Sequence, residues 1–100
     1  MTRKIGLLVN DMPVETDYFV QGFIDHTISG MMEALEGTGP INNLELSVDG
    51  ERVTVNLNDR LIPTNPFVSK IIRNTVTGMV SSLKGVGEVN RLVLYLRRDA

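Results

Sequence analysis

The feature that most constrains this chain is an internal repeat. Aligned with itself at an offset of 48, the sequence places residues 1–48 on residues 49–96 without a gap, and 15 of these 48 aligned pairs are identical. The identical pairs run from Asn10 and Asn58 to Leu46 and Leu94, and similar pairs such as Ile5 and Val53 extend the match into the other segments. A chain of 100 residues forms one compact domain. We therefore predict a single domain, residues 1–100, built of two similar halves.

Each half has the pattern of a strand, a helix and a second strand. Apolar residues alternate in the first and last segments of each half, which predicts half-buried strands. Between them, apolar residues recur at helical spacing over about 20 residues, or roughly six turns. The predicted strands are near 5–9, 44–48, 53–57 and 92–96, and the predicted helices are 17–36 and 65–84.

Residues at the ends of these segments support the helix boundaries. Asp17 and Asn65 are suited to cap the two helix N-termini, and Pro66 suits a first helical position. Gly37 and Gly85 are suited to the left-handed residue that follows a helix. The helical pattern is therefore bounded at both ends in each half.

One broad arc of each helix is apolar, and we expect it to face the sheet and the neighbouring helix. Gly30 and Gly78 lie at equivalent positions inside the helices, where glycine is unfavourable, so we expect something to approach the backbone closely there. The residues of the two arcs are Phe19, Val20, Phe23, Ile24, Thr27, Ile28, Met31 and Leu35, and Phe67, Val68, Ile71, Ile72, Thr75, Val76, Met79 and Leu83.

The pair Asp49-Gly50 separates two alternating runs and predicts a hairpin. The order is then βαββαβ, which resembles the ferredoxin-like fold: an α+β sandwich with two helices on one face of a four-stranded antiparallel sheet. That resemblance implies the strand order 4-1-3-2. If the hairpin opened, the two halves could instead exchange between subunits.

Composition excludes several classes of function. Without cysteine there is no disulfide framework, thiolate metal site or cysteine nucleophile, and we expect no cofactor and no metal. The apolar run Ile5–Val9 is too short for an export signal, and no stretch reaches the 18 or more apolar residues of a membrane span, so we expect a soluble cytoplasmic protein. The net charge of −2 makes nucleic acid an unlikely partner.

An apolar group on the outward face of the predicted sheet is the first candidate site. Leu8, Val93 and Tyr95 fall on the first and last strands, whereas the other two strands place polar residues outward. Apolar surface beside an edge strand favours contact with a partner or a second copy. We interpret these three residues as a candidate homodimer interface.

A weaker candidate is a ligand site near the loop between the first strand and the first helix. It combines Asp11, Glu15 and His26, with Asp59 as the counterpart of Asp11 in the second half. His26 is the one histidine of the chain and the first candidate for a general base. Asn-Asp pairs are also ordinary turn residues, and the two Asn-Asp loops are expected at opposite ends of the sheet.

Two charge patterns complete the candidates. Arg3, Lys4, Arg97 and Arg98 are expected at one end of the sheet, where they form a weak candidate site for phosphate or nucleic acid, without aromatic residues for base stacking. The two predicted helices carry opposite charges, so they would be complementary to each other or across a dimer. Helix 17–36 carries Asp17, Asp25, Glu33 and Glu36, and helix 65–84 carries Lys70, Arg73 and Lys84.

The sequence therefore leaves three functional readings. The preferred one is a small non-enzymatic interaction or regulatory module that forms a homodimer. The second is a small-molecule-binding protein or enzyme with its site near the first strand–helix loop. The third is a protein that binds phosphate or nucleic acid through its basic end.

Overall fold

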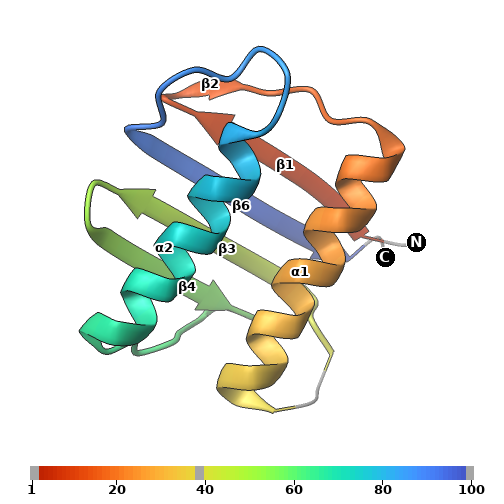
Figure 1. Cartoon of the computed structure of the whole chain (residues 1–100). Helices are drawn as coiled ribbons and strands as arrows, with labels where there is room; N and C mark the ends of the chain where they lie inside the picture. The colour runs from red at the N-terminus through yellow and green to blue at the C-terminus, as the bar shows by residue number, and fades with distance from the viewer. Residues whose placement is uncertain (1–2, 38–39, 99–100) are drawn as a thin grey trace.

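The chain folds into two layers, with two helices on one face of an antiparallel sheet (Figure 1). The computed structural model describes residues 3–37 and 40–98. The α+β class and the placement of both helices on one face agree with expectation. The four-stranded prediction is wrong, because the sheet has six strands in the order β2-β1-β6-β3-β4-β5.

The elements follow the expected βαββαβ order with one short strand added after β1 and one after β4. The helices run in opposite directions across the sheet (Figure 1). The bounds are β1 Arg3–Val9, β2 Met12–Pro13, α1 Tyr18–Glu36, β3 Asn43–Asp49, β4 Arg52–Leu57, β5 Arg60–Leu61, α2 Pro66–Ser81 and β6 Arg91–Arg98.

The two short strands arise from the repeated Asn-Asp pair. Asn10 and Asp11 have φ angles of 51° and 68°, and Asn58 and Asp59 have 52° and 65°. Positive φ at both central residues is what a two-residue type I′ hairpin turn requires, and Asn and Asp tolerate it better than most residues. The chain therefore folds back at once, and β2 pairs with the end of β1 as β5 pairs with the end of β4.

The asparagine of each turn also holds the neighbouring strand. Asn10 Oδ1 accepts hydrogen bonds from the backbone N–H groups of Asn90 and Arg91 at 2.9 and 3.0 Å, while its Nδ2 donates to the Glu88 carbonyl at 2.9 Å. Asn10 thus fastens the end of β1 to the start of β6.

The same arrangement recurs 48 residues later. Asn58 Oδ1 accepts from the backbone N–H groups of Asn42 and Asn43 at 2.8 and 3.0 Å, and its Nδ2 donates to the Pro40 carbonyl at 3.0 Å. Asn58 thus fastens the end of β4 to the start of β3. The Asn-Asp turns lie at opposite ends of the sheet, as expected from sequence.

These turns explain why the expected strand order 4-1-3-2 is wrong. In that order, the first and third predicted strands would be central and would need both edges for pairing. In the structure, one edge of β1 is partly occupied by β2 and one edge of β4 by β5. β1 and β4 therefore flank the central pair β6 and β3, which pair with each other from Asn43↔Arg97 to Asp49↔Arg91.

The helix caps and the hairpin between β3 and β4 follow the sequence closely. Asp17 and Asn65 accept hydrogen bonds from the N–H groups of Val20 and Val68, each at 2.8 Å. Gly37 ends α1 with a φ of 84°. α2 ends at Ser81, earlier than predicted, and Gly85 with a φ of 85° belongs to the loop beyond it.

The core lies between the helices and the sheet. The central strands supply residues that are at most 3% exposed, and each helix contributes one stripe. Met32, which lay outside the predicted apolar arc, is buried at 2% exposure. The most deeply buried large side chains are Ile24, Ile28, Leu44, Leu46, Val55, Val76, Val80, Leu92, Leu94 and Leu96.

Candidate functional site

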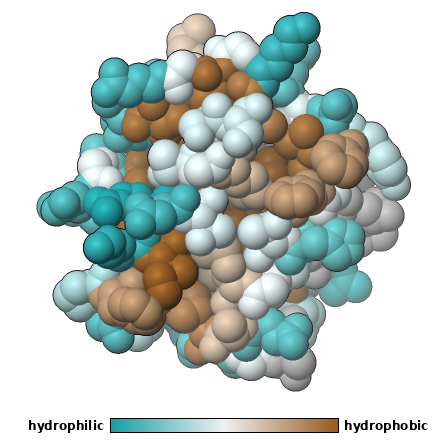
Figure 2. Space-filling view, viewed as in Figure 1, coloured by the Kyte–Doolittle hydropathy of each residue, from teal (hydrophilic) through white to brown (hydrophobic). Residues whose placement is uncertain are grey.

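The outer surface of the helix layer carries large apolar side chains that the fold does not bury. On α1, Tyr18, Phe19 and Phe23 are 79%, 74% and 54% exposed. On α2, the repeat counterparts of the two phenylalanines, Phe67 and Ile71, are 69% and 49% exposed. Figure 2 shows the resulting apolar areas on this face of the molecule, separated by polar side chains. We call these five residues the helix-face patch.

The helix-face patch corrects the expectation that the whole apolar arc of each helix faces inward. At about 100° per residue, the predicted arc of α1 runs from Phe19 to Ile28 and spans about half the circumference. The sheet covers the stripe of Ile24, Ile28 and Met32, which are at most 2% exposed. One sheet face cannot cover half a helix, so the flank that holds Phe19 and Phe23 stays exposed.

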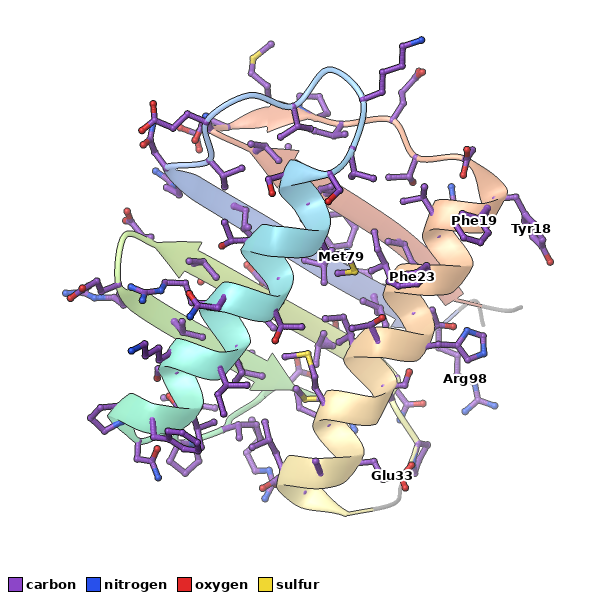
Figure 3. The ribbon with its side chains drawn as sticks, viewed as in Figure 1. Tyr18, Phe19, Phe23, Glu33, Met79 and Arg98 are labelled. Carbon is purple, nitrogen blue, oxygen red and sulfur yellow. The ribbon has the colours of Figure 1, made fainter. Side chains whose placement is uncertain are left out.

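A groove of about 610 Å³ runs between the two helices next to this patch. Figure 3 shows Phe23 of α1 and Met79 of α2 pointing toward each other from opposite sides of the groove. Thr27 and Thr75 also line it, so equivalent positions of the two halves meet there. The complete lining is Phe19, Val20, Phe23, Ile24, Thr27, Thr75, Met79, Ser82 and Leu83.

The interior glycines of the helices do not make the contacts predicted for them. Both Gly30 and Gly78 are exposed, and a β-carbon added at either position has nothing within 4 Å. The expected close approach inside the subunit is therefore wrong. The helices lie on either side of a groove, so these two positions do not press on a neighbouring element of the same chain.

The charges of the helices are partly engaged. Glu36 pairs with Arg60, and Arg73 lies 3.7 Å from Glu51. Asp25, expected on the exposed face, is 7% exposed and accepts a hydrogen bond from Ser29 Oγ at 3.3 Å. Its position just beside the buried stripe of α1 explains this burial. Glu33 and Lys70 are exposed on α1 and α2.

The residues of the candidate ligand site have separate surroundings. Asp11 lies 3.1 Å from Arg91, and Glu15 is exposed in the loop before α1. His26 lies two turns into α1, where its Nδ1 donates to the Gly22 carbonyl at 2.8 Å. Asp59 accepts from Asn43 Nδ2 at 3.3 Å, at the other end of the sheet from Asp11. Ser29, the hydroxyl three residues beyond His26 on the helix, donates to Asp25 Oδ1.

The predicted interface residues are neighbours on the open face of the sheet. Leu8 lies opposite Val93 in the β1–β6 register, and Tyr95 lies opposite Gly6. All three side chains are half-buried. Arg97 places its guanidinium 5.0 Å from the centre of the Tyr95 ring. The candidate group is therefore contiguous, but smaller and less exposed than the helix-face patch.

The basic end of the sheet is also assembled by strand register. Arg3 lies opposite Arg98, and Lys4 lies opposite Arg97. Arg98 donates to Asn42 Oδ1 at 3.2 Å. Two of these cations are thus already engaged, Arg97 with a ring and Arg98 with an amide.

Across residues 3–37 and 40–98, no group of three or more histidine, aspartate or glutamate side chains is placed to hold a metal ion. Neither described helix is long and apolar enough to cross a membrane. Comparison with protein-family models, curated proteins and solved structures found no match.

Sequence reasoning missed the helix-face patch although the signal for it was present. An apolar arc that spans half the circumference of a helix is wider than a single sheet face can cover. One end of each arc consists of large apolar residues, Phe19 and Phe23 on the first helix and Phe67 and Ile71 on the second. The rings of Phe19 and Phe23 lie side by side on the surface in a tilted arrangement, with their centroids 6.1 Å apart.

Proposed function

We propose that this chain is a small protein-interaction module that acts as a homodimer. The observation that carries the proposal is the helix-face patch, whose five large apolar side chains are 49–79% exposed. Single exposed apolar residues are ordinary, but grouped ones mark surfaces that another molecule covers. Here they form two groups, one in the first turns of each helix: Tyr18, Phe19 and Phe23 on α1, and Phe67 and Ile71 on α2.

The size of the surface supports association with a protein. The Cα atoms span 34 × 33 × 18 Å, and the helix layer covers one broad face of this flat molecule. A stable protein–protein interface takes about 800 Å² from each partner, which a face of these dimensions can supply. Burying this face would also enlarge the modest core of a two-layer domain of 100 residues.

The edges of the sheet support face-to-face association over sheet extension. Each edge ends in a strand of two residues, Met12–Pro13 on one side and Arg60–Leu61 on the other. Very short edge strands, and proline within one, discourage pairing with another chain. These short edge strands argue against a dimer in which two copies extend one sheet.

The proposal is tested by measuring the mass of the gently purified protein across low to high micromolar concentrations by native mass spectrometry and light scattering. We expect a species of twice the chain mass of 11.1 kDa that dissociates on dilution. A particle that stays monomeric at high micromolar concentration would overturn the proposal.

The groove between α1 and α2 favours a second candidate function, the binding of a small apolar molecule. Its volume of about 610 Å³ falls in the range of about 300–1,000 Å³ typical of ligand pockets, and Phe19, Phe23 and Met79 line it. The same native mass spectrum separates the two functions. A subunit mass above that of the chain, lost on denaturation, would favour a bound ligand.

A further inference from the structure

We propose that the helix layer is the dimer interface, with α1 of one copy lying along α2 of the other, so that the exposed glycines receive the exposed apolar side chains. This inference rests on the proposed homodimer and names the surface and the arrangement that form it. It replaces the open sheet face around Leu8, Val93 and Tyr95 as the predicted interface.

The charges of the helices favour a second copy of the chain as the molecule that covers this face, with its α2 packed on α1. α1 contains acidic side chains and neither lysine nor arginine, whereas α2 contains Lys70 and Arg73 and no acid. In a twofold dimer with the helix layers face to face, α1 can lie over α1 or over α2 of the other copy. The first arrangement places like charges together, and the second places opposite charges together.

The residue pairs that face each other across the groove show which positions of α1 and α2 lie at the same height along the helix axes. Phe23 faces Met79 across it, and Thr27 and Thr75 line it together. Since the helices run in opposite directions, one step toward the C-terminus of α1 matches one step toward the N-terminus of α2. A twofold axis along the helices preserves these levels when α1 of one copy is placed over α2 of the other.

Counting along the two helices from these pairs, Glu33 of one copy lies at the same height along the helix axis as Ser69 of the other. Lys70 is the next residue, about 1.5 Å away along the axis. Glu33 and Lys70 are both exposed. Counted at about 100° per residue, both lie on the outer surface of their helices and lean away from the groove. The dimer therefore places two Glu33–Lys70 pairs at its rim, one on each side of the twofold axis.

The same count places the glycines opposite the apolar side chains. Gly30 is level with Ile72, one residue from Ile71, and Gly78 is level with Ile24, one residue from Phe23. Ile71 and Phe23 are 49% and 54% exposed, while a β-carbon at Gly30 or Gly78 would meet nothing within 4 Å. Glycine in the middle of a helix is unfavourable, and nothing in the subunit accounts for it here. A side chain of the other copy packed against each glycine would explain why no larger residue stands there.

This arrangement has the anatomy of a protein interface. Phe19 and Phe23 line the groove, and the exposed Ile71 and Phe23 face the glycines of the other copy, while Glu33 and Lys70 lean away from the groove toward the rim. Apolar and aromatic residues at the centre with charged residues at the edge are typical of such contacts. Figure 3 shows Phe23 beside the groove and Glu33 farther along α1.

The first test adds side chains at Gly30 and Gly78, where the proposed dimer leaves room only for side chains of the other copy. The variant Gly30→Gln and Gly78→Gln adds polar side chains to open surface of the subunit and replaces poor helix formers with a good one, so the monomer remains folded. We expect its dimer dissociation constant to rise about a hundredfold or more, because the added side chains occupy the positions of Phe23 and Ile71 of the other copy. Circular dichroism checks that the helices are retained.

The second test reverses the rim charges. Glu33→Lys alone and Lys70→Glu alone should each weaken the dimer about tenfold, since each places like charges together twice per dimer. The double variant should restore dimerisation to near the wild-type constant. Restoration by the second charge reversal is not expected if the residues affect only folding.

The control substitutes the rival surface, using Leu8→Ser with Val93→Thr on the open sheet face. A wild-type protein that is monomeric would defeat the proposed function itself. A wild-type dimer that survives the glycine and charge variants but is lost in the sheet-face variant would overturn this inference and leave the homodimer standing. A ligand mass retained by a monomer would overturn both in favour of the groove ligand.

Discussion

The ring of Tyr95 lies directly over Gly6 on the open face of the sheet. The two residues are opposite each other on β6 and β1, and a β-carbon at residue 6 would lie 1.9 Å from Cζ of the tyrosine. The ring thus covers backbone that any side chain at residue 6 would block. This contact explains why strand β1, which would otherwise favour larger residues, contains a glycine.

The substitution Gly6→Ala should therefore destabilise the protein by about 1–3 kcal/mol, because the tyrosine ring must leave its position. Urea denaturation measures the change in unfolding free energy. Gly87→Ala is the matched control, since a β-carbon there meets nothing within 4 Å. Combining Gly6→Ala with Tyr95→Ala should recover part of the loss, and equal losses with and without the tyrosine would contradict the contact.

Each turn asparagine should contribute to stability through the strand it fastens. Asn58→Ala removes three hydrogen bonds to the backbone between Pro40 and Asn43 and places alanine at a φ of 52°, so we expect a loss of about 1–3 kcal/mol. Asn10→Ala should cost a similar amount. Asn58→Gly accommodates the positive φ but still loses the hydrogen bonds, so it separates the two effects.

Because the two turns lie at opposite ends of the sheet, the losses of Asn10→Ala and Asn58→Ala should add in the double variant to within about 0.5 kcal/mol. Chemical denaturation of the single and double variants checks this. A strongly non-additive result would mean that the two halves of the sheet do not hold their strands independently.

The helix caps give a third prediction. Asp17→Ala and Asn65→Ala should each lower the unfolding free energy by about 1 kcal/mol, since each side chain accepts the N–H of the residue three positions later at 2.8 Å. Asp17→Asn and Asn65→Asp keep the acceptor and should remain close to wild type. Thermal unfolding followed by circular dichroism distinguishes the two pairs.

Two adjacent residues of α1 test which face of the helix is exposed. Ile24 is 0% exposed, so Ile24→Ala should cost about 2–5 kcal/mol. Phe23 is 54% exposed, so Phe23→Ser, measured at a concentration where the protein is monomeric, should cost less than about 1 kcal/mol. If Phe23→Ser destabilised the monomer as much as Ile24→Ala, the exposed position of Phe23 would be wrong.

The candidate interface was predictable only in part. Exposed charges on the two helices and the apolar group at Leu8 and Val93 were visible in the sequence. The helix-face patch was not recognised, because a helical wheel gives the direction of Phe19 or Phe67 but not how much of that direction a neighbouring element covers. The sequence also marks Gly30 and Gly78 as unusual, but the close approach that it predicts for them inside the subunit is absent.

The sequence by itself determined the local structure of this protein. Helical and alternating periodicity, the caps Asp17 and Asn65, and the turn residues act over a few positions, and their physical preferences are largely independent of the rest of the chain. Strand order and helix exposure were decided by tertiary structure. Strand order depends on which edge of β1 remains free once the chain turns back at Asn10, and helix exposure depends on the separation of α1 from α2. Both are relations between segments far apart in the sequence, so no local pattern contains them.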